Sequence, residues 1–264
     1  MIDYQTIIEA ALRLPNPLTE AHLRRLAQAA QVRPATRLLD VACGGGELLN
    51  SWALWYEVNG TGVDAAEAAI HLAEQRANEL KVWAQVQYTV SEALDFPQSF
   101  HQYHIVSHLG LAAWGDQLGE ALNTLRAALR DNEDGVLLIG ETFWRKPPSA
   151  EACAALGLPA NTLRSLDEVA TQLLAHDVEL LDMIVPTPED WDAFMSAQWR
   201  AISDWLPACE DVALANRVRT QWQQSQLSYL RYERELIGWA AFVLRAAGQR
   251  VAPPPPEFDW QQRG

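Results

Sequence analysis

A short stretch of the sequence, residues 37–47 with the letters RLLDVACGGGE, constrains the fold more than any other. Its apolar residues Leu38, Leu39 and Val41 are typical of a buried central strand, and three glycines at positions 44–46 follow. Glycine has no Cβ, so a ligand can lie directly against the backbone there. Residues 48–56 have helix-compatible, largely apolar character, and the free amide groups at that helix's start would point into the same space. The segment therefore predicts a strand, a binding loop and a helix that together form a binding edge.

A second acidic residue ends the next short strand. Residues 60–64 read GTGVD, and an acid at such a strand end reaches the ribose hydroxyls of a bound nucleoside in doubly wound folds. A dinucleotide loop requires G-x-G-x-x-G, whereas the third position after Gly46 is Leu49. The pattern thus favours a nucleotide-type cofactor other than NAD. An NAD-dependent dehydrogenase is the less favoured alternative, supported only by the strand, the glycine loop and the distant acid.

The same stretch resembles motif I of the class I S-adenosylmethionine (SAM) methyltransferases, an acid followed by G-x-G-x-G. Asp40 stands at the acid position, Ala42 replaces the first glycine, and Gly44 and Gly46 fill the other two. The resemblance implies SAM as the cofactor, with S-adenosylhomocysteine (SAH) as its product. Bound in this way, the methionine part of SAM would lie against these four residues.

The resemblance continues at the ends of the third and fourth strands. Residues 90–94, VSEAL, look like the family's glycine-acid-alanine sequence, in which the acid faces the adenine amino group. The fourth strand usually opens with an aspartate, and here it opens with His104. The residues that the resemblance implies for cofactor binding are Asp40, Ala42, Gly44, Gly46, Asp64, Ala65, Glu92, Ala93, Leu109 and Gly110.

Later segments resemble a bacterial small-molecule-type subgroup of this family whose substrates are unassigned. Its GEPYW-like, QW and YLRYxRE-like sequences have counterparts here in GETFW at 140–144, QW at 198–199 and YLRYERE at 229–235. The similarity therefore covers nearly the whole chain. One departure follows the fourth strand, where the subgroup has GATW and this chain reads GLAAW at 110–114.

Helical and extended patterns alternate along the chain, which indicates a largely parallel sheet with helices on both faces. Before the first strand, residues 4–31 predict two helical stretches broken at 15–17, with Thr19 as a helix N-cap. In the subgroup this segment closes over the cofactor, which would place Asn16 and Leu18 near it. The later elements expected are helix 65–80, strand 84–90, strand 103–108, helix 118–130, strand 135–139, helix 166–176, strand 178–185 and a last strand at 238–245.

About 50 residues separate the last two strands, far more than a hairpin requires. Their apolar spacing is helical and predicts a lid over the carboxyl edge of the sheet. The fold class is therefore α/β, a doubly wound, Rossmann-like sheet of seven mostly parallel strands with an N-terminal helical segment and an inserted helical lid. The expected division is a helical cap at 1–35, a SAM-binding core at 36–185, the lid at 186–235, the last core strand at 236–250 and a proline-rich tail at 251–264.

Two residues are candidates for accepting the acceptor's proton, His108 and Glu141, because both should lie at the carboxyl edge of the sheet. Methyl transfer from a sulfonium also proceeds without an obligatory base. Aromatic residues could form a box for a planar or cationic acceptor, although helical spacing is equally typical of ordinary core. The substrate-binding candidates are Trp114, Trp144, Trp199 and Tyr229.

A metal site is not expected. The sequence HQYHIVSH at 101–108 resembles a metal cluster, but only His104 and His108 share a strand face. The three cysteines lie far apart without a C-x-x-C spacing, which favours a reducing, cytoplasmic setting. No apolar run reaches 18 residues, and the first 14 residues lack the pattern of a signal peptide, so neither a membrane span nor a leader is expected.

Charge limits the class of substrate. The chain has 34 acidic and 20 basic side chains and a formal net charge of −14, which on average repels phosphate backbones. A nucleic acid partner is therefore not expected, and the oligomeric state is left open. The function that the sequence favours is methyl transfer from SAM to oxygen, nitrogen or another soft nucleophile of a small molecule. A non-catalytic protein that binds SAM or SAH is the main alternative.

Overall fold

The protein is described by a computed structural model covering residues 4–9, 11–92, 96, 102–111, 114–130 and 135–246. Seven strands form one sheet in the order β3-β2-β1-β4-β5-β7-β6, in which β7 alone runs opposite to the other six. This confirms the predicted fold class. The strands are β1 (Arg37–Val41), β2 (Asn59–Asp64), β3 (Val86–Val90), β4 (Ile105–His108), β5 (Val136–Trp144), β6 (Val178–Ile184) and β7 (Ile237–Ala246).

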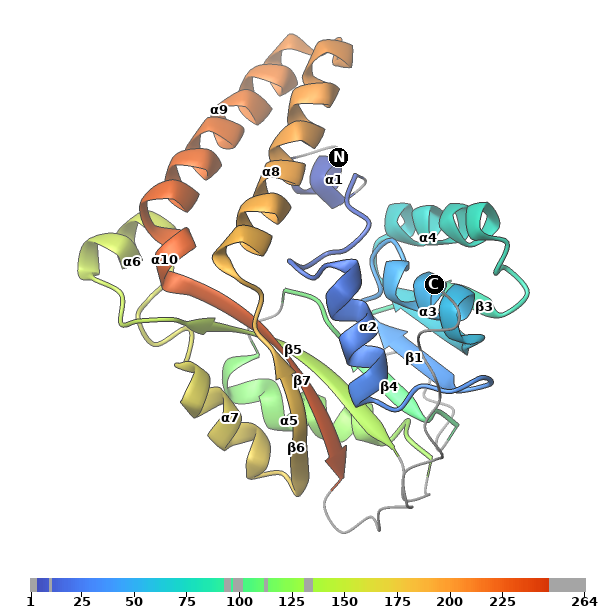
Figure 1. The fold of residues 1–264 in the computed structure, drawn as a ribbon. Helices are drawn as coiled ribbons and strands as arrows, with labels where there is room; N and C mark the ends of the chain where they lie inside the picture. Colours follow the sequence, from blue (N-terminus) through green and yellow to red (C-terminus); the bar gives the residue numbers. More distant parts are fainter. Residues whose placement is uncertain are drawn as a thin grey trace.

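Helices cover both faces of the sheet (Figure 1). Neighbouring residues of β1 point to opposite faces, so Leu38 packs in the core cluster of α2, α3 and α4 and Leu39 in that of α5 and α7. These helices are α2 (Glu20–Ala29), α3 (Glu47–Tyr56), α4 (Glu67–Leu80), α5 (Leu118–Arg126) and α7 (Leu166–Leu174). The shorter ones are α1 (Tyr4–Glu9), α6 (Ala150–Leu156) and two 3-10 turns, η1 (Gly115–Gln117) and η2 (Leu206–Ala208).

The strand order reverses at β1, which pairs with β2 on one side and β4 on the other. In open α/β sheets ligands bind at the carboxyl ends of the strands beside such a reversal. The register places Asp40 opposite Ser107 and Val41 opposite His108. The glycine loop after β1 and the end of β4 therefore lie side by side.

The helical insertion before the last strand is also confirmed. It consists of α8 (Pro188–Trp205), α9 (Val212–Ser228), the π-helical turn η3 (Tyr229–Glu233) and α10 (Arg234–Leu236). Thr187 caps α8 in a reciprocal hydrogen-bonded pair with Asp190, and Pro188 occupies the first turn. Figure 1 shows α8 and α9 as a long hairpin that projects from the sheet, with α1 packed against it. None of the helices in the described ranges is long and apolar enough to cross a membrane.

Some boundaries differ from the sequence-based expectations. β5 was expected to end at residue 139 but continues to Trp144, because it pairs with β7 from Val136↔Arg245 to Trp144↔Ile237. The helix expected at 118–130 ends at Arg126, and α6 was not predicted. Ala93, His101 and the proline-rich tail at 251–264 lie outside the described residues. The domain boundaries stay predictions.

Candidate active site

The glycine loop after β1 has a left-handed backbone at three positions. Gly44 and Gly46 have φ angles of 52° and 69°, and Gly46 is the N-cap of α3. Ala42, which stands in place of the first motif glycine, also has a positive φ of 54°. That conformation costs a residue with a Cβ roughly 1–2 kcal/mol. The loop therefore keeps the motif's backbone shape despite the alanine, at the expense of local strain.

Tyr88 of β3 supports this loop from below, which the sequence did not reveal. A Cβ on Gly46 would lie 2.7 Å from Tyr88 Oη and 2.7 Å from Ala73 Cβ. A Cβ on Gly62 of β2 would lie 2.5 Å from the same tyrosine ring. Two glycines thus make the space for one partly buried aromatic ring beneath the loop.

Replacing Gly46 by alanine is expected to destabilise the protein by about 2–5 kcal/mol, because backbone strain adds to the overpacking against Tyr88. The free energy of unfolding in urea measures the change. Gly157→Ala is the matched control, since Gly157 has a φ of 65° but no atom within 4 Å of an added Cβ. The control should lose only the strain, roughly 1–2 kcal/mol. Equal losses in the two variants would show that the contact with Tyr88 is unimportant.

Asp64, at the carboxyl end of β2, accepts hydrogen bonds from the backbone of the glycine loop and of the residues just before α4. Its Oδ2 accepts a hydrogen bond from the Gly44 amide at 2.8 Å, and its Oδ1 accepts one from the Ala66 amide at 2.9 Å. The carboxylate therefore ties the glycine loop to the start of α4. Ala65 and Glu92 are exposed near it, and Glu92 follows β3, whose Val90 pairs with Asp64.

Asp40 is buried beneath the same loop, in the middle of the sheet. The Ser107 hydroxyl donates a hydrogen bond to its Oδ1 at 2.6 Å. Burial raises the pKa of Asp40 to about 7, against the lowering effect of Ser107, and the negative charge of Asp64 raises it further. A cavity of about 10 Å³, room for roughly one water molecule, lies beside Asp40, Asn16, Ala42 and Leu109.

The segment at residues 11–18, which we call the strap, crosses the glycine loop. Asn16 is buried; its Nδ2 donates to the Leu109 carbonyl at 2.7 Å, and its Oδ1 accepts from the Leu18 amide at 3.2 Å. Where Gly45 would carry a Cβ, the Leu12 carbonyl is 3.3 Å away. The Leu12 side chain packs against the lid cluster of Phe194, Met195 and Tyr229. The strap thus touches the loop, the end of β4 and the lid.

His108 is the last residue of β4 and is 5% exposed. Burial lowers the pKa of its imidazole to about 4, so the ring is neutral at neutral pH. Its Nδ1 is buried and has no hydrogen-bond partner in the described part of the chain. The Trp114 ring stands edge-on to the imidazole, with ring centroids 4.6 Å apart.

Glu141 of β5 holds Trp114 in this position. The Trp114 amide donates to both carboxylate oxygens at 3.1 Å, and the Glu141 side chain is almost fully buried. Burial raises the pKa of Glu141 to about 7, against the lowering effect of hydrogen bonds from the Trp114 and Gly115 amides. The two candidates for proton transfer therefore belong to one cluster, in which Glu141 contacts His108 through Trp114.

The other substrate-binding candidates lie elsewhere. Trp199 and Tyr229 contact each other in the lid with ring centroids 5.8 Å apart, and the Tyr229 hydroxyl donates to Asp192 at 2.7 Å. Trp144 is buried in a separate cluster with Leu163 and Leu236, and its indole donates to the Ala160 carbonyl at 2.9 Å. The structure thus brings Trp114 to His108, Trp199 to Tyr229, and Trp144 to neither pair.

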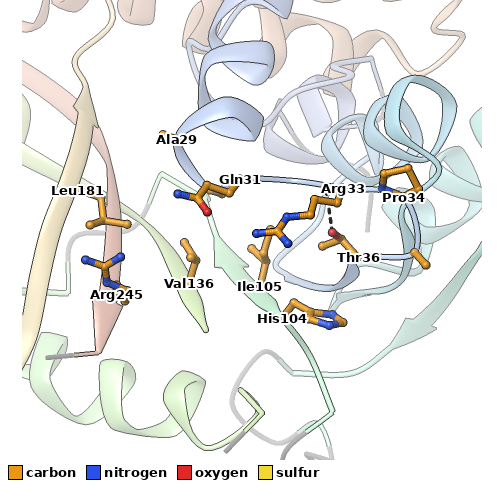
Figure 2. Close-up of a pocket in the computed structure, with 12 residues that line it drawn as sticks. Ala29, Gln31, Arg33, Pro34, Thr36, His104, Ile105, Val136, Leu181 and Arg245 are labelled. Carbon is orange, nitrogen blue, oxygen red and sulfur yellow. Dashed lines mark hydrogen bonds between the residues drawn. The ribbon is translucent and has the colours of Figure 1, made fainter. Parts of the chain in front are cut away.

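His104, which comes directly before β4, lies at the amino edge of the strands. His104 Nδ1 accepts from the Arg37 amide at 2.9 Å, and the ring lines a pocket of about 240 Å³ with Arg33 and Arg245 (Figure 2). This pocket is at the amino edge of the strands, whereas the glycine loop and His108 are at the carboxyl edge. Within the described residues, no group of three His, Cys, Asp or Glu side chains is placed to hold a metal ion.

Two further residues of the site were missed from the sequence. Ser107 bonds Asp40, and the buried Trp239 of β7 donates from its indole to the Gly110 carbonyl at 3.1 Å. Ser107 lies beside Asp40 in the strand register, a signal that only the pairing of β1 with β4 reveals. Trp239 comes from the end of the chain, and nothing in its local sequence points to Gly110.

A sheet of this order, with a glycine loop after β1 and acids at the ends of β1 and β2, defines a class I SAM-dependent methyltransferase. A family model described as a methyltransferase domain matches residues 38–132. The chain is 31% identical to the protein YjhP of Escherichia coli K12 over 246 residues, which cover 91% of this chain and 97% of that protein. The chain belongs to the SAM-dependent methyltransferases.

Solved structures agree with this assignment. A SAM-dependent methyltransferase from Geobacter sulfurreducens, crystallised with SAH, superposes with a TM-score of 0.85 at 30% identity and covers 93% of this chain and 100% of its own. Its counterpart from Thiobacillus denitrificans, also with SAH, has a TM-score of 0.85 at 28% identity over 93% of this chain and 99% of that one. The family is one of enzymes whose cofactor is SAM, so the comparisons favour neither the NAD-dependent dehydrogenase nor a non-catalytic binding protein.

Proposed function

We propose that this enzyme transfers the methyl group of SAM to a small molecule bound between the carboxyl edge of the sheet and the helical lid. The observation that carries the proposal is the cluster of buried His108 and Glu141 with partly buried Trp114, at the end of β4 beside the glycine loop. These side chains converge at the point where an acceptor would meet the sulfonium. The negative charge of the chain favours a small acceptor over a nucleic acid.

The residues present fit the cofactor that the family uses. Asp40 is a buried carboxylate that accepts a hydrogen bond from the neutral Ser107 hydroxyl, so it suits the ammonium group of the methionine part. Gly44 is half-buried and Gly46 is buried in the loop that would hold that part, and Asp64, at the end of β2, would bind the ribose hydroxyls. The remaining contacts follow the resemblance: Ala42 beside the methionine part, Ala65 beside the ribose, Glu92 and Ala93 for the adenine, and Leu109 and Gly110 beside the sulfonium.

A bound SAM would supply an already activated methyl group, and the acceptor atom would attack its carbon in line with SAH as the leaving group. The bond from sulfur to the methyl carbon breaks as the bond from the acceptor to that carbon forms, and SAH leaves. The chain's own residues mainly orient the acceptor and exclude water, and orientation alone contributes up to about 7–11 kcal/mol. Neutral His108 has a lone pair for the proton that the acceptor loses.

The lid and its aromatic residues would select the acceptor. Trp199 and Tyr229 line the lid cluster that the strap contacts, and we assign them to the acceptor side together with Trp114. Trp144 stays a prediction from the resemblance, because its cluster with Leu163 and Leu236 is separate from the lid cluster. The three cysteines are unpaired in the structure, and Cys43 is buried behind the loop, which fits the proposed cytoplasmic setting.

Labelling in a cell extract tests this function. The purified enzyme is incubated with SAM that carries a deuterated methyl group. One reaction contains the desalted macromolecular fraction of the extract, and the other contains its small-molecule fraction. We expect the label in one or a few compounds of the small-molecule fraction, detected by mass spectrometry, and its loss with Asp64→Ala. Label transferred only to protein or nucleic acid would contradict the small-molecule assignment.

A variant pair then tests the proton acceptor with the labelled compound as substrate. His108→Ala is expected to lower kcat by roughly 10²–10⁴-fold, the usual contribution of a general base, without a matching change in SAH affinity. Unchanged turnover in the double variant His108→Ala/Glu141→Gln would exclude both residues. Trp83→Phe is the control, because Trp83 is 64% exposed and lies outside this cluster.

A further inference from the structure

A pocket of about 240 Å³ opens at the amino edge of the sheet, outside the site described above (Figure 2). Its walls come from the turn between α2 and β1, from the starts of β4 and β5, and from β6 and β7. His104 lines it, whereas His108, at the other end of β4, belongs to the candidate active site. A strand rises about 3.3 Å per residue, so these two histidines are roughly 13 Å apart. A ligand in this pocket would therefore bind apart from SAM.

The pocket is basic, although the chain as a whole is acidic. Arg33, Arg245 and His104 line it, and none of the described lining residues is an acid. The whole chain, by contrast, has 34 acidic and 20 basic side chains. Salt screens charges beyond about 8 Å at physiological ionic strength, so nearby groups decide the local potential. The lining therefore favours an anion.

The two arginines have unused hydrogen-bond donors. A guanidinium has five N–H donors. Within the described ranges, the guanidinium of Arg33 bonds to no other residue, while its backbone amide donates to Thr36 Oγ1 at 2.9 Å. Arg245 donates to Glu179 Oε2 from Nε at 3.1 Å and from Nη2 at 2.5 Å, which leaves three donors. Figure 2 shows Arg33 and Arg245 on opposite sides of the pocket.

The contacts of His104 also call for a negatively charged oxygen. Its Nδ1 accepts from the Arg37 amide at 2.9 Å, so the ring proton is on Nε2, which faces Arg130 Nη1 at 2.7 Å. A guanidinium only donates, so two donors face each other. The other tautomer would move the same conflict to the Arg37 amide. An anionic oxygen that accepts from His104 and Arg130 would replace this repulsion by two hydrogen bonds.

Two groups oppose an anion here, and both are weaker than the cations. Glu179 neutralises part of the charge of Arg245, but its side chain is 48% exposed, and exposed ion pairs contribute little. The C-terminus of α2 carries the negative end of a helix dipole, about half an elementary charge. Its last carbonyls are already bonded by the amides of residues 30–32. Arg33 and Arg130 each carry a full charge and form no ion pair within the described residues.

The apolar part of the lining indicates the size and kind of the ligand. Ile105, Val136 and Pro34 contribute apolar surface. A water molecule occupies about 30 Å³ of liquid, so the pocket has room for a charged group and a short carbon skeleton. It is smaller than most sites for drug-sized ligands. Arginine forks pair with carboxylate or phosphate oxygens, and several cations together favour more than one negative charge.

We propose that this pocket binds a small organic anion with at least two negative charges, a phosphate monoester or a dicarboxylate. The charged group would lie among Arg33, His104 and Arg245. The carbon skeleton would lie against Ile105 and Val136. This second site is independent of the methyl acceptor and of the proposed function.

Titration of the full-length protein with matched anions tests this site. Glycerol 3-phosphate and malonate carry about two charges near neutral pH, acetate carries one, and sodium chloride keeps the ionic strength constant. Nitrogen-15 NMR follows the backbone amides of Arg33, Thr36 and Ile105 beside the pocket, and of Gly44 and Gly46 in the glycine loop. We expect one of the dianions to shift the pocket amides and to bind at least about tenfold more tightly than acetate, as loss of a charged hydrogen bond implies. The dianion that binds more tightly distinguishes a phosphate ligand from a dicarboxylate.

A repeat of the titration with SAH present tests whether the two sites are separate. The affinity for the preferred dianion should stay within about twofold, because distant sites act almost independently. Binding that SAH abolishes would place the anion in the cofactor site and contradict the proposal.

Variants assign the side chains. Arg33→Gln, at an exposed position, and Arg245→Gln should each weaken binding of the preferred dianion by about tenfold. Arg217→Gln is the matched control, because it makes the same change of charge at an exposed site of α9 and should stay within about twofold. His104→Asn keeps an acceptor near Nδ1 for the Arg37 amide but has no counterpart of Nε2, so it should also bind the dianion more weakly.

Three further results would overturn the proposal. Equal affinity for acetate and both dianions would exclude selection of a multiply charged ligand. Shifts confined to Gly44 and Gly46, or no shift of the pocket amides with either dianion, would show that the pocket is not the binding site. Equal weakening by Arg33→Gln and Arg217→Gln would indicate a general effect of charge.

Discussion

An Asp64→Ala variant is expected to bind SAH at least about a hundredfold more weakly than the unchanged protein. The substitution removes the carboxylate that accepts from the Gly44 and Ala66 amides, and hydrogen bonds to a charged group contribute about 1.5–3 kcal/mol each. The glycine loop loses its tie to α4, and the ribose hydroxyls lose their proposed acceptor. Since about 1.4 kcal/mol corresponds to a tenfold change, loss of these interactions accounts for the drop.

Isothermal titration calorimetry with SAH and SAM measures this effect. Glu67→Ala is the matched control, because Glu67 is an exposed acid in the first turn of the same helix, α4. Its affinity should stay within about twofold of the unchanged protein, since an exposed charge contributes little. An Asp64→Ala variant that binds as tightly as Glu67→Ala would show that neither the loop nor the ribose depends on this carboxylate.

An Asp40→Asn variant is expected to be more stable than the unchanged protein at pH 8 and equally stable near pH 4. Burial raises the folded-state pKa of Asp40 to about 7, so the folded protein binds this proton more tightly than the unfolded chain. The stability that the proton contributes is fully present below about pH 4 and is lost as the pH rises to about 7. Asparagine has no such proton to lose and can still accept from Ser107.

The difference between the two proteins should reach on the order of 4 kcal/mol above pH 7, from a shift of about three pH units. Urea unfolding at several pH values, without cofactor, measures it. Glu74→Gln, at an exposed site of α4, should follow the unchanged protein at every pH. The same Asp40→Asn variant should bind SAH more weakly, because it lacks the charge for the ammonium group. A parallel pH profile for Asp40→Asn and the unchanged protein would refute the buried-charge account.

The sheet and the glycine loop could be predicted because their signals are local. Residues 38–46 predict the strand and the loop that follows it. The helical spacing of Phe194, Met195 and Ile202 predicts a lid helix, and these three side chains are buried in the structure. The signal for Asp64 at the end of β2 is equally local, and its carboxylate contacts the glycine loop through the Gly44 amide. Where sequence neighbours decide the structure, the sequence was sufficient.

The rest depended on contacts between distant residues. The extension of β5 to Trp144 is decided by pairing with β7, about a hundred residues later. The position of Tyr88 under Gly46 follows from two absent Cβ atoms on different elements. Glu141 was expected to act on a proton, and its bonds to Trp114 became visible only when β5 was placed beside the turn after β4. No local pattern encodes any of these neighbours.

The strap would couple the binding of SAM to the binding of the methyl acceptor. Its Leu12 carbonyl and Asn16 side chain meet the glycine loop and β4, and the Leu12 side chain packs against the lid, so one short segment forms a wall of both binding regions. A cofactor that orders this segment prepares the wall against which the acceptor packs. Coupling of this kind is reciprocal, so the acceptor must strengthen SAM binding by the same factor.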